Sequence, residues 1–239
     1  LTTFKIGGEA RFFYRATNEK EVNEALKFAD DNQLEVFVLG GGSNVLIADE
    51  GFDGLVLQID LRGIKFEEAD ENFVSVSVSA GEDWDDFVAL CVKRDLAGIE
   101  CLSGIPGLVG GTPIQNVGAY GQEVSETITR VKVLDKESKE LLTFSKSECG
   151  FEYRKSIFNT SHKDRYIVLE VNYSLEKKGT PKIVYADLKS MFGDTIPSLG
   201  ETREAVCEIR KSKGMLVRQG GLDSQSAGSF FKNPVKSPS

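Results

Sequence analysis

The segment from Gly104 to Gly121 constrains the fold of this chain more than any other stretch. It reads GIPGLVGGTPIQNVGAYG, with two prolines and no charged residue, in a chain that is 28% charged. Glycine permits positive φ and close approach of other groups, whereas proline stiffens turns and removes amide donors. Linkers are usually polar and rich in Gly and Ser, but this segment carries apolar side chains such as Ile105 and Val109. We therefore expect an ordered loop wrapped around a polar ligand, such as a phosphate or a ring system, rather than a linker.

The composition is that of a globular protein. The 239 residues suit one or two domains, and a hydrophobic content of 40% is enough for a real core. The net charge of −8 argues against general nucleic-acid binding, which requires basic patches. An anionic ligand must therefore be held by local groups: loop amides, helix N-termini and a few Arg or Lys side chains.

Residues suited to metal, disulfide or membrane chemistry are scarce. The four cysteines lie far apart without a C-x-x-C pair, so neither a zinc site nor a disulfide framework is indicated. His162 is the only histidine, and no stretch approaches the roughly 20 apolar residues of a membrane span. We therefore expect a reduced, cytoplasmic protein with no metal, no nucleic-acid partner and no membrane partner.

A second glycine-rich motif follows a short apolar stretch. Residues 35–39 read as a buried strand that runs directly into Gly40-Gly41-Gly42-Ser43-Asn44. A strand, three glycines and small polar residues suggest a phosphate-binding turn whose successive amides form an anion nest. The motif is neither G-x-G-x-x-G, since Val45 stands where the last glycine belongs, nor a P-loop. On the motif alone, a purely structural turn fits equally well.

The periodicity along the chain predicts an α+β protein with short strands. Helices are expected after the capping residues Asn18 and Asp83, and the Val-Ser alternation of residues 73–79 is typical of a half-buried strand. Further strands are expected at 11–16, 54–59 and 166–175, a β-hairpin at 127–134 and 140–144, a helix beginning within 184–188, and another at 201–213.

Two polar clusters remain ambiguous from residue type alone. Arg154 lies among aromatic residues, where an arginine is either a structural stacking residue or a preorganised anion clamp. Ser229 lies between Gly228 and two phenylalanines with no histidine at hand. Proton donation therefore suits Ser229 better than nucleophilic attack, and without further context it is an ordinary turn serine.

Several motifs together closely resemble one family. They are GGGSN at 40–44, IPGLVGGTPIQNVGAYG at 105–121, AGSFFKNP at 227–234, the opening TTFKIGG, and ECGFEYRKSIF. These motifs, in this order, resemble the UDP-N-acetylenolpyruvoylglucosamine reductases, flavoproteins that complete UDP-N-acetylmuramic acid in bacterial peptidoglycan synthesis. V-Y-A-D-L at 184–188 resembles the branch that has a substrate-binding tyrosine on a mobile loop.

The resemblance implies FAD as cofactor, within the wider vanillyl-alcohol-oxidase-like group of flavoproteins. In that group the two glycine-rich segments hold FAD, with the pyrophosphate on loop amides. Members with covalent flavin use a histidine in these loops, and none occurs here, so non-covalent FAD is implied. The implied FAD-binding residues are Gly40, Gly41, Gly42, Ser43, Asn44, Val45, Leu46, Ile105, Pro106, Gly107, Gly110, Gly111, Thr112, Ile114, Gln115, Asn116, Gly118, Ala119, Tyr120 and Gly121.

The resemblance also implies a reaction. NADPH reduces FAD, and a hydride then passes from the flavin to C3 of the enolpyruvyl group of UDP-N-acetylglucosamine enolpyruvate while C2 is protonated. Arg154 matches the family's arginine for the negative charge that develops, and Ser229 matches its proton donor. Tyr153, Tyr185, Lys232 and Asn233 are the implied substrate-binding residues.

The resemblance implies three structural parts and one missing element. We expect FAD-binding subdomains at 1–60 and 61–177 and the beginning of an α+β substrate-binding domain at 178–239. The family places a catalytic glutamate near its C-terminus, but this sequence has no acidic residue after Asp223. We therefore expect an incomplete substrate domain and a chain that binds FAD but can be inactive. A bacterial, cytoplasmic monomer is favoured. The rival hypotheses are a flavin oxidase of the same fold and a non-catalytic flavin- or nucleotide-binding remnant.

Overall fold

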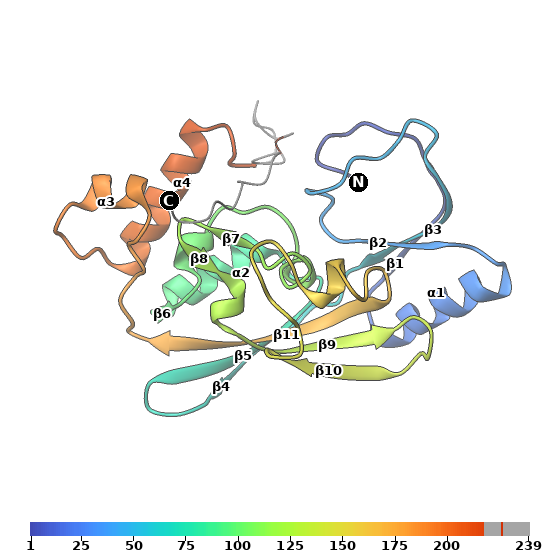
Figure 1. Ribbon diagram of the computed structural model, residues 1–239, viewed down its shortest axis with the longest axis horizontal. Helices are drawn as coiled ribbons and strands as arrows, with labels where there is room; N and C mark the ends of the chain where they lie inside the picture. Colours follow the sequence, from blue (N-terminus) through green and yellow to red (C-terminus); the bar gives the residue numbers. More distant parts are fainter. Residues whose placement is uncertain (218–225, 227–239) are drawn as a thin grey trace, which may run out of the picture.

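A computed structural model describes residues 1–217 and residue 226. Helices and strands are mixed, and the strands form a small parallel sheet, a larger antiparallel sheet and a two-stranded ribbon (Figure 1). The larger sheet lies along one side of the molecule, while the small sheet with its helix lies toward one end. The prediction of an α+β architecture is confirmed.

The small sheet contains the N-terminal strands and one helix. Its order is β1-β3-β2, with parallel pairing throughout. The side chain of Asn18 accepts a hydrogen bond from the amide of Glu21 and so caps α1, as the sequence predicted. The elements are β1 (Ala10–Ala16), α1 (Glu19–Asp31), β2 (Val36–Leu39) and β3 (Phe52–Ile59).

Strand β2 differs from the expectation of a buried strand. Val36, Phe37 and Val38 are only half-buried, and of this strand Leu39 alone is buried. The reason is topological, because β2 is an edge strand of the small sheet and one of its sides faces an open cleft. Sequence periodicity reports apolar character but cannot distinguish a core-facing strand from one that faces a ligand site.

The larger sheet is antiparallel, with strand order β10-β9-β11-β5-β4 and β6 paired to β11. The expected hairpin is present as β9 and β10, and β5 alternates buried and half-buried residues as predicted. Strand β4 was not anticipated. The elements are β4 (Ile64–Glu68), β5 (Phe73–Ser79), β6 (Leu96–Ala97), β9 (Ile128–Asp135), β10 (Leu141–Ser145) and β11 (Tyr166–Lys177).

Helix α2 (Trp84–Lys93) joins the larger sheet to the glycine-rich segment. The side chain of Asp83 accepts the amide of Asp86 and caps the helix. Trp84 and Phe87 are buried against Tyr173 of β11. The backbone amide of Trp84 also donates to the carbonyl of Gly107, 3.0 Å away, so packing of this helix fixes the segment's path.

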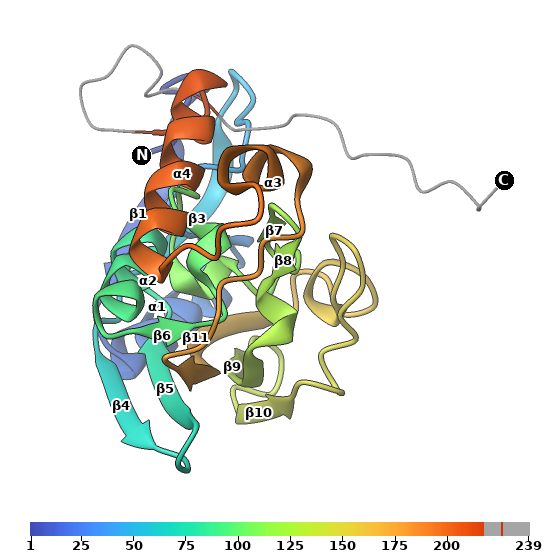
Figure 2. The same cartoon turned by 90° about the vertical axis from the view of Figure 1, so that its left-hand side faces the viewer.

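The last two described helices form a second, smaller hydrophobic cluster. They are α3 (Ala186–Phe192) and α4 (Leu199–Ser212), and Leu188, Val206 and Ile209 pack with Tyr120. Figure 2 shows α4 lying above α2, with α3 beside it. Helix α3 begins at Ala186, within the range 184–188 expected from the sequence, and Tyr185 is extended and occupies its N-cap position. The domain boundaries at 60 and 177 stay predictions.

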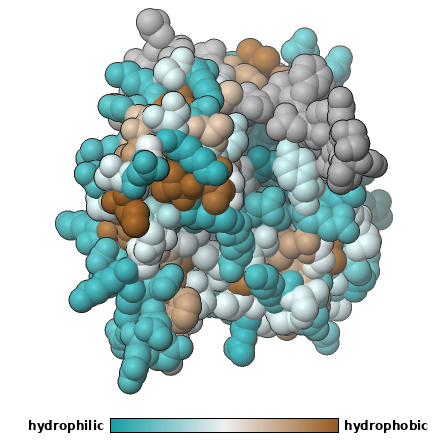
Figure 3. Space-filling view, turned by 60° about the vertical axis from the view of Figure 1, so that its left-hand side comes forward, coloured by the Kyte–Doolittle hydropathy of each residue, from teal (hydrophilic) through white to brown (hydrophobic). Residues whose placement is uncertain are grey.

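The exposed surface is mostly hydrophilic. Figure 3 shows several separate brown patches on one face rather than one continuous apolar surface. None of the helices among the described residues is both long and apolar enough to cross a membrane.

The ion pair between Asp135 and Arg165 gives a testable stability prediction. Arg165 lies 2.7 Å from the buried carboxylate of Asp135, and its hydrogen bond holds the pKa of that carboxylate below its ordinary value of 3.8. A lowered carboxyl pKa stabilises the fold above the unfolded pKa, and this stabilisation is lost as pH falls through the folded pKa. We expect Arg165→Ala to lower the melting temperature at pH 7 and to flatten its fall between pH 5 and 3, measured by circular dichroism, whereas an unchanged acid profile would contradict this assignment.

Candidate cofactor-binding cleft

A large cleft lies between the small sheet and the glycine-rich segment. Its volume is about 1030 Å³, at the upper end of the range of roughly 300–1,000 Å³ for small-molecule sites. Strand β2, Ile59 at the end of β3 and Val168 of β11 form part of its wall. Both glycine-rich segments contribute the remainder of the central wall. The cleft is therefore built where the two sheets meet.

The two glycine-rich segments touch each other across this cleft. A Cβ atom on Gly41 would lie 2.9 Å from the Cα of Gly107, so the backbones approach more closely than any side chain permits. Gly107 itself has φ +126°, a conformation that L side chains rarely adopt. The hydroxyl of Ser43 donates to the carbonyl of Pro106 at 3.1 Å, and the side-chain amide of Asn44 donates to the side-chain oxygen of Gln115 at 3.3 Å. The sequence left open that residues 40–44 form a purely structural turn. The close contact with the second segment differs from an isolated turn of that kind.

The first segment presents free amide donors. The backbone N–H groups of Gly41, Gly42, Ser43 and Asn44 donate no hydrogen bond to any other residue in the described part of the chain. Successive unpaired amides in a glycine turn form a concave site for an anion. A Cβ placed on Gly40 would meet no atom within 4 Å, so the turn borders open space. This geometry fits the pyrophosphate of a dinucleotide.

The second segment is more regular than the loop expected from its composition. It contains the 3-10 helix η2 (Val109–Gly111) and a ribbon formed by β7 (Gly118–Ala119) and β8 (Gln122–Glu123). The hydroxyl of Thr112 lies 3.0 Å from that of Tyr173 and ties the segment to β11. Hydrogen bonds of this kind, together with the buried side chains of Val109 and Val117, hold its backbone in place.

Arg154 reaches the cleft from a tight turn. The backbone groups of Glu152 and Lys155 exchange two hydrogen bonds, which place Tyr153 and Arg154 at the tip. Arg154 has φ +57°, an uncommon value for a residue with a side chain, and such strain is concentrated at functional sites. Its Nη2 donates to the carbonyl of Gly118 at 2.5 Å, which fixes the guanidinium against β7.

Further hydrogen bonds brace this turn on the second glycine-rich segment. Ser156 donates to the carbonyl of Ile114 at 2.7 Å, and Asn159 donates to the carbonyl of Arg154 at 3.2 Å. Asn116 is 1% exposed, and its side chain donates to Glu123 and to the carbonyl of Glu152. Arg154 is thus held by the same backbone that lines the cleft. Arg154 also lies 5.6 Å from the ring of Tyr153, so both roles left open for it stay predictions.

Tyr120 and Tyr185 stand at the end of the cleft formed by the last helices. Their rings meet edge to face with centroids 5.3 Å apart. Burial raises the pKa of Tyr120, an effect partly offset by the nearby charge of Arg210. Tyr185 is 43% exposed and lines the cleft, so part of its side chain is accessible to a ligand.

The structure brings together most of the residues predicted for the site. Of the expected FAD-binding residues, all line the cleft except Leu46, which is 65% exposed, and Asn116, which braces the wall from behind. Tyr153, Arg154 and Tyr185 also line it. Ser229, Lys232 and Asn233 lie outside the described residues. The roles assigned to individual residues stay predictions.

Sequence reasoning missed several residues that line the cleft. They come from distant parts of the chain, and no local motif marks them: Val36, Phe37, Val38, Leu39, Lys136, Asp164, Tyr166, Arg210 and Lys213. Only the position of residues 36–39 directly before the glycine turn offered a usable signal, since ligands commonly bind beyond the ends of parallel strands.

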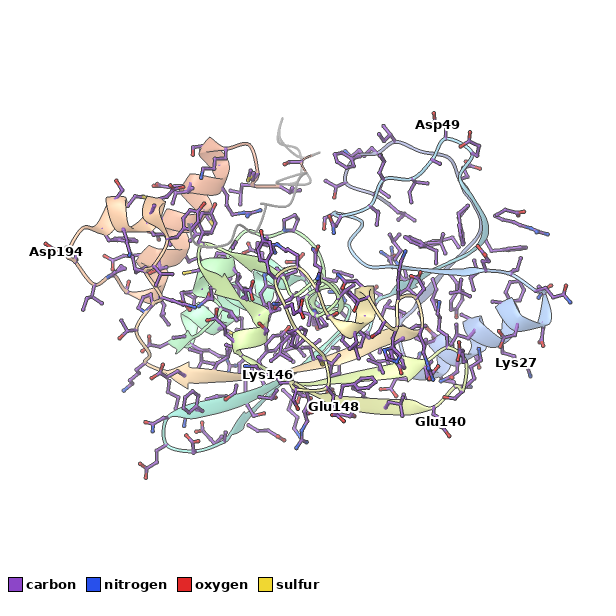
Figure 4. The ribbon with its side chains drawn as sticks, in the orientation of Figure 1. Lys27, Asp49, Glu140, Lys146, Glu148 and Asp194 are labelled. Carbon is purple, nitrogen blue, oxygen red and sulfur yellow. The ribbon has the colours of Figure 1, made fainter. Side chains whose placement is uncertain are left out.

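The charge lining the cleft differs from that of the whole chain. Its described charged residues are four cations and three acids: Lys136, Arg154, Arg210, Lys213, Glu123, Glu126 and Asp164. In Figure 4 the labelled acids Asp49, Glu140 and Asp194 lie at the periphery of the molecule. The acidic excess of the chain is therefore not concentrated in the cleft, which can accept an anionic ligand. No group of acidic, cysteine or histidine residues in the described part of the chain could hold a metal ion.

The fold and the cleft define a flavoprotein of the FAD-binding class. Residues 10–144 match the family model for the FAD binding domain. A structural neighbour, 6-hydroxy-D-nicotine oxidase from Arthrobacter nicotinovorans, shares this fold at 22% identity, with a TM-score of 0.55 over 73% of this chain and 38% of that one. FAD is thus the cofactor for which the cleft is built, as predicted.

Closer relatives identify the family. UDP-N-acetylenolpyruvoylglucosamine reductase of Thermobifida fusca is 45% identical over 241 residues, covering 99% of this chain and 67% of the relative. That of Streptomyces coelicolor is 44% identical, covering 98% of this chain and 61% of the relative. The crystal structure of the Thermus caldophilus reductase matches 98% of this chain and 71% of that one, at 25% identity and a TM-score of 0.69. The chain belongs to the UDP-N-acetylenolpyruvoylglucosamine reductase family, and it spans about two thirds or less of the length of the two curated relatives.

Proposed function

We propose that this protein is an FAD-dependent reductase that uses NADPH to convert UDP-N-acetylglucosamine enolpyruvate to UDP-N-acetylmuramate in peptidoglycan biosynthesis. The observation that carries the proposal is the joint placement of both glycine-rich segments and Arg154 on one cleft. The family supplies the reaction, and the cleft supplies groups that suit it.

The residues that would hold FAD follow from the geometry. The unpaired amides of residues 41–44 suit the pyrophosphate, and the apolar side chains of β2, Ile59 and Val168 offer a wall for a ring system. When bound, FAD supplies hydride transfer from NADPH to C3 of the enolpyruvyl group. The protein's contribution is then to orient the cofactor, exclude water and stabilise charge.

Arg154 would stabilise the negative charge that develops on the substrate. Its guanidinium is already anchored to the carbonyl of Gly118, so little reorganisation is needed when charge develops. Tyr153 and Tyr185 flank the same cleft and would contact the substrate. Ser229 is the proposed proton donor to C2, and Lys232 and Asn233 are proposed contacts to the substrate phosphates.

The cellular setting and partners are proposed from the same reasoning. The relatives named above come from bacteria, and nucleotide sugars of this kind are cytoplasmic metabolites, so we propose a bacterial, cytoplasmic enzyme that acts as a monomer. The rival oxidase hypothesis is supported only by the shared fold at 22% identity.

Flavin binding by the 239-residue chain tests the proposal most directly. Purified protein should be yellow or should become so on adding FAD, with a dissociation constant of about 1 µM or tighter, a typical scale for specific small ligands. Fluorescence quenching of added FAD gives the affinity, and anaerobic addition of NADPH to the full-length protein should bleach the flavin absorbance. A protein that cannot be reconstituted with FAD would exclude this function, and flavin reduced by substrate and reoxidised rapidly by oxygen would favour the oxidase.

A further inference from the structure

A buried arginine in the wall of the cleft forms no salt bridge with any acid among residues 1–217. Arg210, on α4, is 7% exposed. Its Nε donates to the carbonyl of Gly104 at 2.9 Å and its Nη2 to the carbonyl of Met215 at 3.0 Å. No carboxylate in the described part of the chain forms a salt bridge with it. Two neutral carbonyls orient the guanidinium but do not neutralise its charge.

The neighbouring cations provide a contrast. Arg203, two turns earlier on the same helix, forms a bidentate pair with Asp85, with distances of 2.6 and 2.8 Å. Lys213 lies 2.6 Å from Asp187. Both acids are thereby occupied by other partners, and Asp85 also accepts the amide of Gly104 at 2.6 Å. The unbalanced charge on this side of the cleft therefore belongs to Arg210.

Burying an uncompensated charge is costly, because the desolvated ion loses its hydration. The same cost lowers the pKa of Arg210, an effect that Tyr120, Cys207 and Asp85 offset only in part. A buried cation that faces a ligand cleft is expected to find its counter-charge in the ligand. Arg210 is hydrogen-bonded to the carbonyl of Gly104, the first residue of the second glycine-rich segment. It therefore lies beside backbone that we expect to bind the cofactor.

The form of FAD determines how much charge it offers to this position. The oxidised ring system is neutral, whereas uptake of two electrons and one proton gives the anion FADH⁻. In the proposed reaction NADPH supplies these as one hydride and leaves as NADP⁺, so charge and electrons balance. A fixed, buried cation stabilises the reduced form more than the oxidised form, since Coulomb interactions are strong where water is excluded.

We propose that Arg210 tunes the cofactor: its buried positive charge, which forms no salt bridge within the described part of the chain, stabilises anionic reduced FAD in the cleft and raises the reduction potential of the flavin. This inference rests on the proposed FAD-dependent function and adds to it a positioning and electrostatic role for a residue of α4. The contact between α4 and Gly104 then has a role besides packing, because it places the charged guanidinium of Arg210 in the wall of the cleft.

The reduction potential of FAD bound to the 239-residue chain, measured by titration against a reference dye, tests this role. Arg210→Met should lower the equilibrium constant for flavin reduction by about tenfold, which for a two-electron couple is about 30 mV. Arg210→Lys, which keeps the charge, should retain a value much closer to wild type. Lys211→Met is the matched control: it removes an exposed cation of the same helix, so it should leave the potential unchanged.

Each outcome decides the inference. Equal potentials in wild type and Arg210→Met, or equal falls in the Met and Lys variants, would show that Arg210 acts only as a clamp on Gly104. If Arg210→Met no longer binds FAD, the measurement is made on Arg210→Gln instead. The glutamine side chain is neutral but keeps an N–H donor for the Gly104 carbonyl. If neither neutral variant retains oxidised FAD, the role is structural and the inference is overturned. Failure of the wild-type chain to bind FAD would instead contradict the proposed function.

Discussion

Arg154→Ala is expected to slow hydride transfer from reduced flavin to the enolpyruvyl substrate by about 100- to 1,000-fold, the usual effect of removing a preorganised charge-stabilising donor. Flavin reduction by NADPH should stay within about threefold of wild type, because no negative charge develops on the enolpyruvyl group in that step. The hydrogen bond from Arg154 to the carbonyl of Gly118 holds the guanidinium in place before charge develops, and such preorganisation is the basis for an effect of this size. Anaerobic stopped-flow measurement of each half-reaction in the full-length protein separates the two steps.

Lys155→Ala is the matched control for this prediction. Lys155 belongs to the same turn and is also cationic, but its side chain lies 3.4 Å from Glu152 and is largely exposed. Its removal should change neither half-reaction appreciably, which excludes a general effect of reduced positive charge in the turn. A normal rate of substrate reduction in Arg154→Ala would remove Arg154 from the reaction, and equal losses in both half-reactions would indicate misplaced flavin instead.

The locally encoded parts of the fold could be predicted from sequence. Each of the N-caps Asn18 and Asp83 accepts a hydrogen bond from an amide only three residues later, so the signal is local in the sequence. The Val-Ser alternation of β5 likewise specifies its buried face directly. The glycine-rich segments were recognisable because their composition is incompatible with a self-stabilising element. They predicted only a polar ligand, and the assignment of FAD, which the family resemblance implied, is confirmed by the family match.

The missed parts depend on contacts between distant residues. Arg210 resembles any basic residue in an amphipathic helix until tertiary packing brings it to Gly104, and Lys136 follows an unremarkable strand. Asn116 was grouped with the cofactor-binding residues because it lies in the motif, yet its φ of +46° turns the side chain into the wall. A motif identifies the segment that binds, while backbone conformation decides which of its side chains reach the ligand.

The contact between the two glycine-rich segments yields the second large prediction, for Gly41→Ala. The added Cβ would lie 2.9 Å from the Cα and 3.4 Å from the carbonyl carbon of Gly107, and both atoms belong to backbone that cannot rotate away. The segments must therefore separate, which also strains the bond from Ser43 to Pro106, and we expect FAD affinity to fall by about tenfold or more, since a shift of about 1 Å disrupts a preorganised site. Fluorescence titration measures the affinity, with Gly200→Ala in α4 as control, because its Cβ would meet only Ser198 Oγ at 3.8 Å and alanine favours the helix. Wild-type FAD affinity in Gly41→Ala would mean that the two segments do not need this close approach to form the cofactor site.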